Sequence, residues 1–190
     1  MLTEISLNVI DIARNSIRAG ASLIQITVRI DDQKKTLRLT IADNGSGMNP
    51  QQLSKVEDPF FTSRTTRRVG LGVPFLKQEA ECTGGTFNIR SEEGKGTVVD
   101  ALFHTGHIDC MPLGDINSSI LMLITTSEEK KVDFVYTYEV DERSFQLDTR
   151  ELREILEGVP FSEPRVSAFI RSFLDENQEA VDKGEIMEER

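Results

Sequence analysis

Asp43 lies in a predicted turn where its carboxylate could recognise a bound ring. Residues 41–48 read Ile-Ala-Asp-Asn-Gly-Ser-Gly-Met, so Gly45, Gly47 and Met48 follow directly. Glycines allow a backbone to approach a bound ring, and a carboxylate accepts hydrogen bonds from a donor such as an exocyclic amine. A strand running into a glycine-rich turn is also typical of an ordinary hairpin, so this stretch alone leaves both interpretations open.

A polar stripe forms the second candidate. Asn8, Asp11, Asn15 and Arg18 are spaced by three, four and three residues, which places them on one face of a helix. The opposite face carries Ile5, Val9, Ile12 and Ser16, and Gly20 ends the pattern. Such a stripe is commonly a solvated face of the helix. Asparagine is a poor helix former, however, so its presence here is not explained by helix stability. A solvated face and a functional stripe therefore both stay open.

The glycines at 70 and 72 form the third candidate. They follow a segment, residues 58–69, that is rich in hydroxyl and guanidinium groups and that we interpret as a loop. Gly70, Leu71 and Gly72 open a predicted helix to about residue 83. Backbone amides at such a helix end attract anions, and a triphosphate is a natural ligand for them. A plain glycine-containing cap is the alternative.

The elements around these candidates predict an α+β fold. Residues 23–30 and 36–42 alternate as strands, residues 86–91 and 97–104 form a second hairpin, and Asn49 and Pro50 begin a short helix. With the helices over 3–19 and 70–83, this order predicts a two-layer α/β sandwich. Its sheet is mixed and mainly antiparallel, with helices covering one face.

The second half reads as a small acidic α+β unit. After a connector at 106–113 come a helix at 115–125, a hairpin over 132–147, and helices at 149–157 and 163–183. We therefore divide the chain into domains 1–105 and 106–190. The second unit could dock on the sheet or bind a partner.

Composition narrows the class of protein. The net charge is −10, and Lys and Arg nearly balance Asp and Glu up to Thr105, so the second half carries the acidic excess. A basic face for nucleic acid is therefore not expected. Two cysteines fit a reducing compartment, and the longest apolar run, residues 120–124, is too short to cross a bilayer. We expect a cytoplasmic protein without a membrane segment.

One cluster resembles a metal site by residue type. His104, His107, Asp109 and Cys110 lie at or just past a predicted strand end. No second ligand pair accompanies them, so we interpret them as polar residues at a strand end.

Taken together, the motifs resemble the nucleotide-binding domain shared by DNA gyrase, heat-shock chaperones, sensor histidine kinases and the mismatch-repair ATPase. The resemblance covers residues 1–105. The helix motif is Asp11 with Asn15, and the DxGxG box is Asp43, Gly45 and Gly47. The phenylalanine-containing box is residues 59–62, and the second glycine box is residues 68–73. The last box, GxGT, is Gly94, Gly96 and Thr97. Arg68 departs from the family pattern, which has glycine there.

The resemblance implies ATP and Mg²⁺ as ligands. It assigns Asp43 to the adenine amino group, Thr97 to a water-linked contact near the same ring, and Asn15 to the metal. It also implies a nucleotide lid over residues 58–69. The remaining candidates for nucleotide contact are Gly45, Gly47, Met48, Phe61, Arg64, Arg67, Gly70, Leu71 and Gly72.

Asp11 is the most informative departure from the family. Hydrolytic members and anti-sigma serine kinases have glutamate there as base, and histidine kinases commonly have asparagine. We predict Asp11 to be a catalytic residue that supports only slow hydrolysis, because its side chain is shorter by one methylene. The resemblance implies a regulatory ATP-dependent kinase of histidine or serine type acting on a protein partner. An ATP-gated interaction module without chemistry and a slow ATPase subunit remain alternatives, and homodimerisation stays open.

Overall fold

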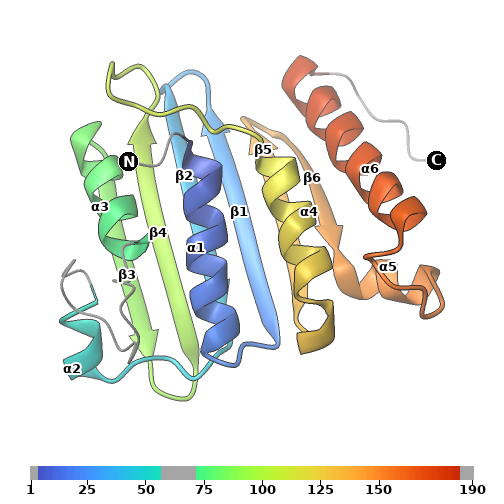
Figure 1. The fold of residues 1–190 in the computed structure, drawn as a ribbon. Coiled ribbons are helices and arrows are strands. Elements are labelled where there is room, and N and C mark those ends of the chain that lie inside the picture. The colour runs from blue at the N-terminus through green and yellow to red at the C-terminus, as the bar shows by residue number, and fades with distance from the viewer. Residues whose placement is uncertain (1–3, 57–71, 185–190) are drawn as a thin grey trace.

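The chain forms one six-stranded sheet in the strand order β3-β4-β2-β1-β5-β6 (Figure 1). The computed structural model describes residues 4–56 and 72–184. Neighbouring strands pair antiparallel except β1 and β5, which run parallel. The strands are β1 (Leu23–Asp31), β2 (Thr36–Asp43), β3 (Thr86–Glu92), β4 (Gly96–His104), β5 (Asp133–Val140) and β6 (Arg143–Asp148).

Four helices, α1, α3, α4 and α6, cover the same face of this sheet (Figure 1). The mixed, mainly antiparallel α+β sandwich predicted from the sequence is therefore confirmed. The helices are α1 (Ile5–Arg18), α2 (Pro50–Leu53), α3 (Gly72–Cys82), α4 (Ile116–Thr126), α5 (Thr149–Ile155) and α6 (Pro164–Lys183), and a 3-10 turn spans Glu128–Lys130.

Strand alternation decides which face the helices cover. On β1, Ile24, Ile26 and Val28 are fully buried beneath the helices. The intervening Gln25 and Arg29 are exposed on the opposite face. Period-two alternation of this kind is what one covered face requires.

The amino end of α1 is held by the connector from the second half of the chain. The backbone amide of Ile5 donates to the carbonyl of Pro112 at 3.0 Å, and that of Ser6 donates to Leu113 at 2.9 Å. These bonds satisfy two of the amides that a helix leaves unpaired at its start. Thr3, where the predicted helix begins, lies outside the described residues.

The second half of the chain joins the sheet of the first. β5 pairs with β1 over eight residues, from Leu23 opposite Asp133 to Ile30 opposite Val140. One hydrophobic core cluster includes residues of α1, α3, α4 and α6 together. The second half therefore extends the sheet by β5 and β6, while partner binding by this unit and the division into domains 1–105 and 106–190 stay predictions.

Candidate functional site

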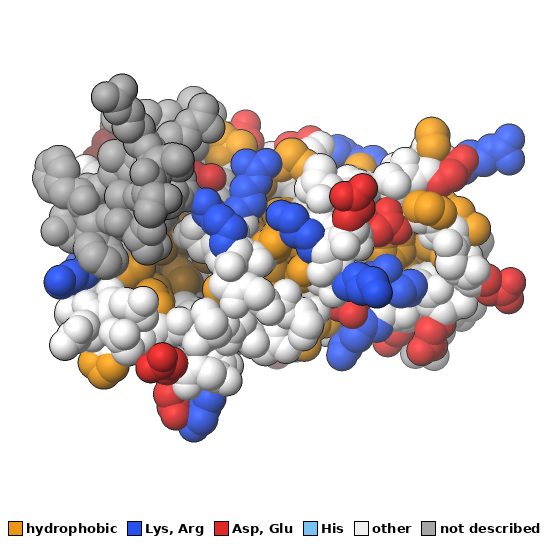
Figure 2. Space-filling model, turned by 60° about the horizontal axis from the view of Figure 1, so that its bottom comes forward, with side chains coloured by type: hydrophobic (Ala, Val, Ile, Leu, Met, Phe, Trp, Pro, Cys, Tyr) orange, Lys and Arg blue, Asp and Glu red, His pale blue; other side chains and the backbone are white. Residues whose placement is uncertain are grey.

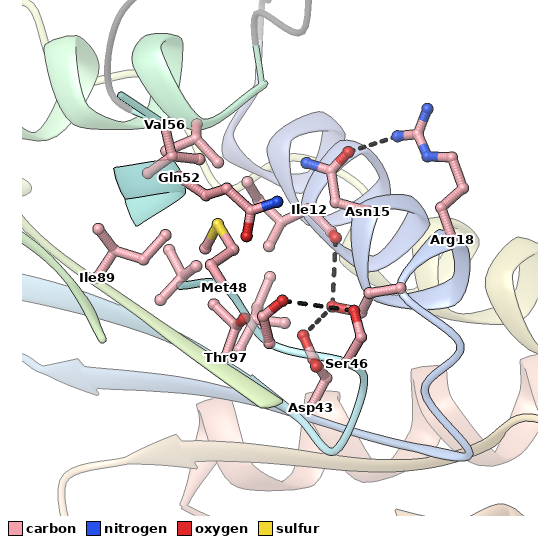
Figure 3. Close-up of a pocket in the computed structure, with 16 residues that line it drawn as sticks. Ile12, Asn15, Arg18, Asp43, Ser46, Met48, Gln52, Val56, Ile89 and Thr97 are labelled. Carbon is pink, nitrogen blue, oxygen red and sulfur yellow. Dashed lines mark hydrogen bonds between the residues drawn. The ribbon is translucent and has the colours of Figure 1, made fainter. Parts of the chain in front are cut away.

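A cavity of about 350 Å³ opens between α1, the end of β2 and the start of β4 (Figure 3). This volume is in the range of small-molecule sites. Aliphatic side chains supply much of its wall, as expected for a site that takes a flat ring. The cavity brings together five residues predicted from the sequence, Asn15, Asp43, Gly47, Met48 and Thr97, with Ile12, Ile41, Val73, Ile89 and Val99 as apolar lining.

Asp43, half-buried at the end of β2, is oriented by two donors. The Ser16 hydroxyl donates to Oδ2 at 2.6 Å, and the Gly45 backbone amide donates to Oδ1 at 2.8 Å. A carboxylate offers about four acceptor positions. The two that remain can accept hydrogen bonds from a ligand in the cavity.

The turn after Asp43 is packed so closely that only glycine fits. A Cβ at Gly47 would lie 2.0 Å from the carbonyl oxygen of Glu92, and the φ of Gly47 is +63°. A Cβ at Gly96 would lie 1.9 Å from the carbonyl oxygen of Asp43. The glycines of the two boxes therefore let two turns meet backbone to backbone beside the cavity.

Thr97 belongs to a small hydroxyl network that the sequence did not reveal. Its Oγ1 lies 2.8 Å from the Oγ of Ser91, its partner across β3 and β4. Ser91 Oγ donates to the Gly96 carbonyl and accepts from the Met48 backbone amide, each at 2.9 Å. Ser91 thus links the Met48 backbone to the Thr97 side chain. Its place in the strand expected to pair with the one that carries Thr97 was the feature of the sequence that could have identified it.

Asn15 and Asp11 lie one helical turn apart on α1. The Asn15 side chain is exposed at the cavity rim, where its Oδ1 accepts a hydrogen bond from the Arg18 guanidinium (Figure 3). Asp11 is half-buried, and a Cβ at Gly72 would lie 3.0 Å from the Cβ of Asp11. The amino end of α3 therefore approaches Asp11 directly, and a glycine makes room for it.

Further residues line or orient the site: Arg18 belongs to the polar stripe noted in the sequence, whereas Ser16 and Gln52 were not proposed as site residues. Ser16, 4% exposed, was assigned to the apolar face of the helix, yet it orients Asp43. Arg18 and Gln52 line the cavity as well. Phe61, Arg64, Arg67, Gly70 and Leu71 lie outside the described residues, so their predicted contacts stay predictions.

Positive charge at this site comes from an arginine of its lining. Figure 2 shows several Lys and Arg side chains gathered beside hydrophobic side chains that are open to solvent. Arg18 lines the cavity itself. Positive charge beside an apolar pocket suits a ligand with a flat ring and an anionic tail.

The oxygen chemistry of the rim fits a magnesium ion. Mg²⁺ prefers oxygen ligands, keeps several waters, and is held by one or two protein groups together with substrate phosphates. The exposed amide oxygen of Asn15 is a ligand of this kind. In the parts of the chain that the structure describes, no group of three or more His, Cys, Asp or Glu side chains gathers as a metal site.

The cluster after β4 behaves as strand-end polar residues. His107 Nδ1 accepts from the Asp109 backbone amide at 3.2 Å, and both side chains are exposed.

Across residues 4–56 and 72–184, no helix has the length and apolar character needed to span a bilayer.

Comparison with known proteins extends these observations. The family model "Histidine kinase-, DNA gyrase B-, and HSP90-like ATPase" matches residues 1–106. Sensor protein kinase FleS of Pseudomonas aeruginosa is 36% identical over 89 residues, which cover 47% of this chain and 22% of that protein. Sensor histidine kinase ZraS of Escherichia coli is 30% identical over 96 residues, covering 50% of this chain and 20% of that protein. This chain thus spans about a fifth of the length of these relatives.

A solved structure described as the N-terminal domain of a DNA repair protein overlaps this chain with a TM-score of 0.49. It is 16% identical, and the overlap covers 77% of this chain and 53% of that one.

Proposed function

Because this chain belongs to the histidine kinase-, DNA gyrase B- and HSP90-like ATPase family, we propose that it is a regulatory ATP-binding protein that acts on a protein partner. ATP occupies the cavity between α1, β2 and β4. The bound nucleotide then either donates its terminal phosphate to the partner or signals its presence to it.

The observation that carries this proposal is the orientation of Asp43. Ser16 and Gly45 fix its carboxylate from one side, and the free acceptor positions suit the exocyclic amine of adenine. Thr97 and the Ser91 hydroxyl beside it offer polar groups near the same ring. Apolar walls on both sides suit the faces of the base.

The polyphosphate would extend from the ring toward α1 and α3. The backbone amides at the amino end of α3 carry partial positive charge that suits an anion. Asn15 would hold Mg²⁺, which when bound neutralises part of the phosphate charge. Asp11, one turn earlier on α1, would accept a proton from an attacking nucleophile.

Neither histidine of this sequence suits the role of phosphate acceptor. The chain has two histidines, His104 and His107. Thr97 lies near the cavity end of β4. His104 is seven positions further along the strand, which corresponds to roughly 20 Å or more. Neither histidine can reach a nucleotide bound beside Thr97.

A second function is favoured by Asp11 itself. An aspartate base is one methylene shorter than the glutamate of hydrolytic relatives, and poor base geometry lowers the rate by about 10²- to 10⁴-fold. Binding without efficient chemistry would make this chain an ATP-gated interaction module. The two functions share the cavity and differ only in whether phosphate moves.

The test has two steps. Calorimetric titration of the purified chain with ATP and Mg²⁺ should show binding that Asp43→Ala abolishes. Incubation with terminally labelled ATP and fractionated cell extract should then label a partner, and Asp43→Ala should prevent the labelling. ATP binding without any labelled partner would favour the interaction module, and absence of ATP binding would refute both functions.

A further inference from the structure

Asn8 and Glu79 form a polar bridge inside the packing of α1 against α3. Asn8 is 0% exposed, and its Nδ2 donates to Glu79 Oε2 at 2.5 Å. Glu79 is half-buried, and burial raises the pKa of its carboxyl above the ordinary value of 4.5. Asn8 belongs to the polar stripe of α1, yet neither the cavity nor the metal site proposed above uses it.

The bridge lies between the two helices that would hold the phosphates. Asn8 precedes Asp11 by about one turn of α1, and Glu79 follows Gly72 by about two turns of α3. The two helices run in opposite directions side by side (Figure 1), so Asn8 meets Glu79 toward one end of the interface and Asp11 meets Gly72 toward the other. Two contacts at different positions along the helix axes fix both the separation of α1 and α3 and their axial register.

Apart from this bridge, α3 is packed largely through apolar side chains. Leu76 and Ala80 are both 0% exposed. Apolar contact is non-directional, whereas a hydrogen bond restricts distance and angle. A buried amide is also costly to desolvate, and the Oδ1 atom of Asn8 has no hydrogen-bond partner among residues 4–56 and 72–184. An apolar pair would therefore hold these helices together at least as well, and what the polar bridge adds is a defined register.

We propose that the Asn8–Glu79 hydrogen bond is a positioning contact that sets where the amino end of α3 lies relative to Asp11 and the phosphate tail. Sliding α3 by one residue would move its amides by about 1.5 Å, which exceeds the tolerance of a hydrogen bond. This role rests on the proposed function, because it assumes that the amino end of α3 faces bound phosphate.

The test replaces the bridge by an apolar pair. The double variant Asn8→Leu with Glu79→Leu should fold and melt near the unmodified chain. It should bind ATP about 10- to 100-fold more weakly, the effect of losing one hydrogen bond to a charged group. Its affinity for adenosine, which lacks phosphate, should not change. Glu79→Gln, which can still accept from Asn8, should retain ATP affinity.

A matched control exists between α4 and α6. Asn117, 4% exposed, donates to Asp175 at 2.8 Å, and its Oδ1 also has no partner within the described part of the chain. The double variant Asn117→Leu with Asp175→Leu likewise replaces an amide–carboxylate hydrogen bond by an apolar pair, and it also removes the ion pair of Asp175 with Arg171. It lies away from the cavity and should leave ATP affinity unchanged.

Three results would overturn the positioning role. They are unchanged ATP affinity in the Asn8 and Glu79 double variant, an equal loss for ATP and adenosine, or failure of Glu79→Gln to retain ATP affinity. Absence of ATP binding by the unmodified chain is a different result, because it refutes the proposed function and the role of the bridge together.

Discussion

Replacing Asp43 by asparagine should weaken ATP binding without unfolding the chain. The substituted side chain would keep one oxygen acceptor for the Gly45 amide, which now donates at 2.8 Å. Its new amide group would face Ser16, whose hydroxyl can accept that bond and donate instead to the Ile12 carbonyl, 3.5 Å away. The fold therefore loses little, while the cavity loses an acceptor for the adenine amine.

The size of the loss follows from the unpaired donor. A buried donor left without its acceptor costs about 1 to 3 kcal/mol. Since 1.4 kcal/mol is tenfold in affinity, Asp43→Asn should raise the Kd for ATP by about 5- to 150-fold. Guanine has an acceptor oxygen where adenine has the amine, so the new amide group should also reduce the preference for ATP over GTP.

The assay is calorimetric titration with ATP and GTP, alongside a thermal melt. Asp100→Asn is the matched control, because Asp100 is also a half-buried strand carboxylate and accepts from the Thr40 hydroxyl at 2.9 Å outside the cavity. It should leave both affinities unchanged. A folded Asp43→Asn protein that binds ATP with the original Kd and the original preference over GTP would refute the assignment of Asp43 to adenine.

Three further predictions concern other parts of the molecule. Gly47→Ala should lower the free energy of unfolding in urea by more than about 2 kcal/mol, because its Cβ would collide with the Glu92 carbonyl. Gly94 has positive φ but nothing within 4 Å of a Cβ, so Gly94→Ala should lower it by only about 1 to 2 kcal/mol. Equal losses in the two variants would contradict the collision. Burial raises the pKa of Glu79, so as pH rises its carboxyl ionises in the unfolded chain before it does in the folded chain. The stability of the unmodified chain should therefore fall relative to Glu79→Gln as pH rises above 4.5. Parallel pH profiles of the two proteins in thermal melts would contradict this. Asp11→Glu should increase ATP turnover by up to about 10²- to 10⁴-fold, and Asp11→Asn should lower the already slow rate further, measured as phosphate release; equal rates in all three proteins would remove Asp11 from the chemistry.

Local signals in the sequence were sufficient to predict the helices and strands. Asn49 and Pro50 predicted a short helix, and the structure has a capping box in which Asn49 accepts from the Gln52 amide at 2.9 Å. Alternation in residues 23–30 predicted a strand with one covered face, which the burial of β1 confirms. Such signals depend on neighbours a few residues away, so a single sequence carries them.

Contacts between distant residues were not predictable in the same way. Asn8 reads as part of an exposed polar stripe, and only the packing of α3 on α1 buries it beside Glu79. Ser91 becomes part of the site because β3 pairs with β4 in a register that puts it opposite Thr97. The motif residues Asn15, Asp43 and Thr97 were predicted because their family pattern is itself a record of such contacts, and the cavity brings them together.

The parallel pairing of β1 with β5 has a consequence for how the chain folds during synthesis. Ile24 pairs with Phe134, so more than a hundred residues must leave the ribosome before this side of β1 is covered. Until then an apolar strand presents unpaired amides and carbonyls, a surface on which other chains can add. Non-local parallel pairing also forms slowly. We therefore expect ribosome-bound intermediates that end before β5 to require protection from aggregation, whereas those that extend past β6 do not.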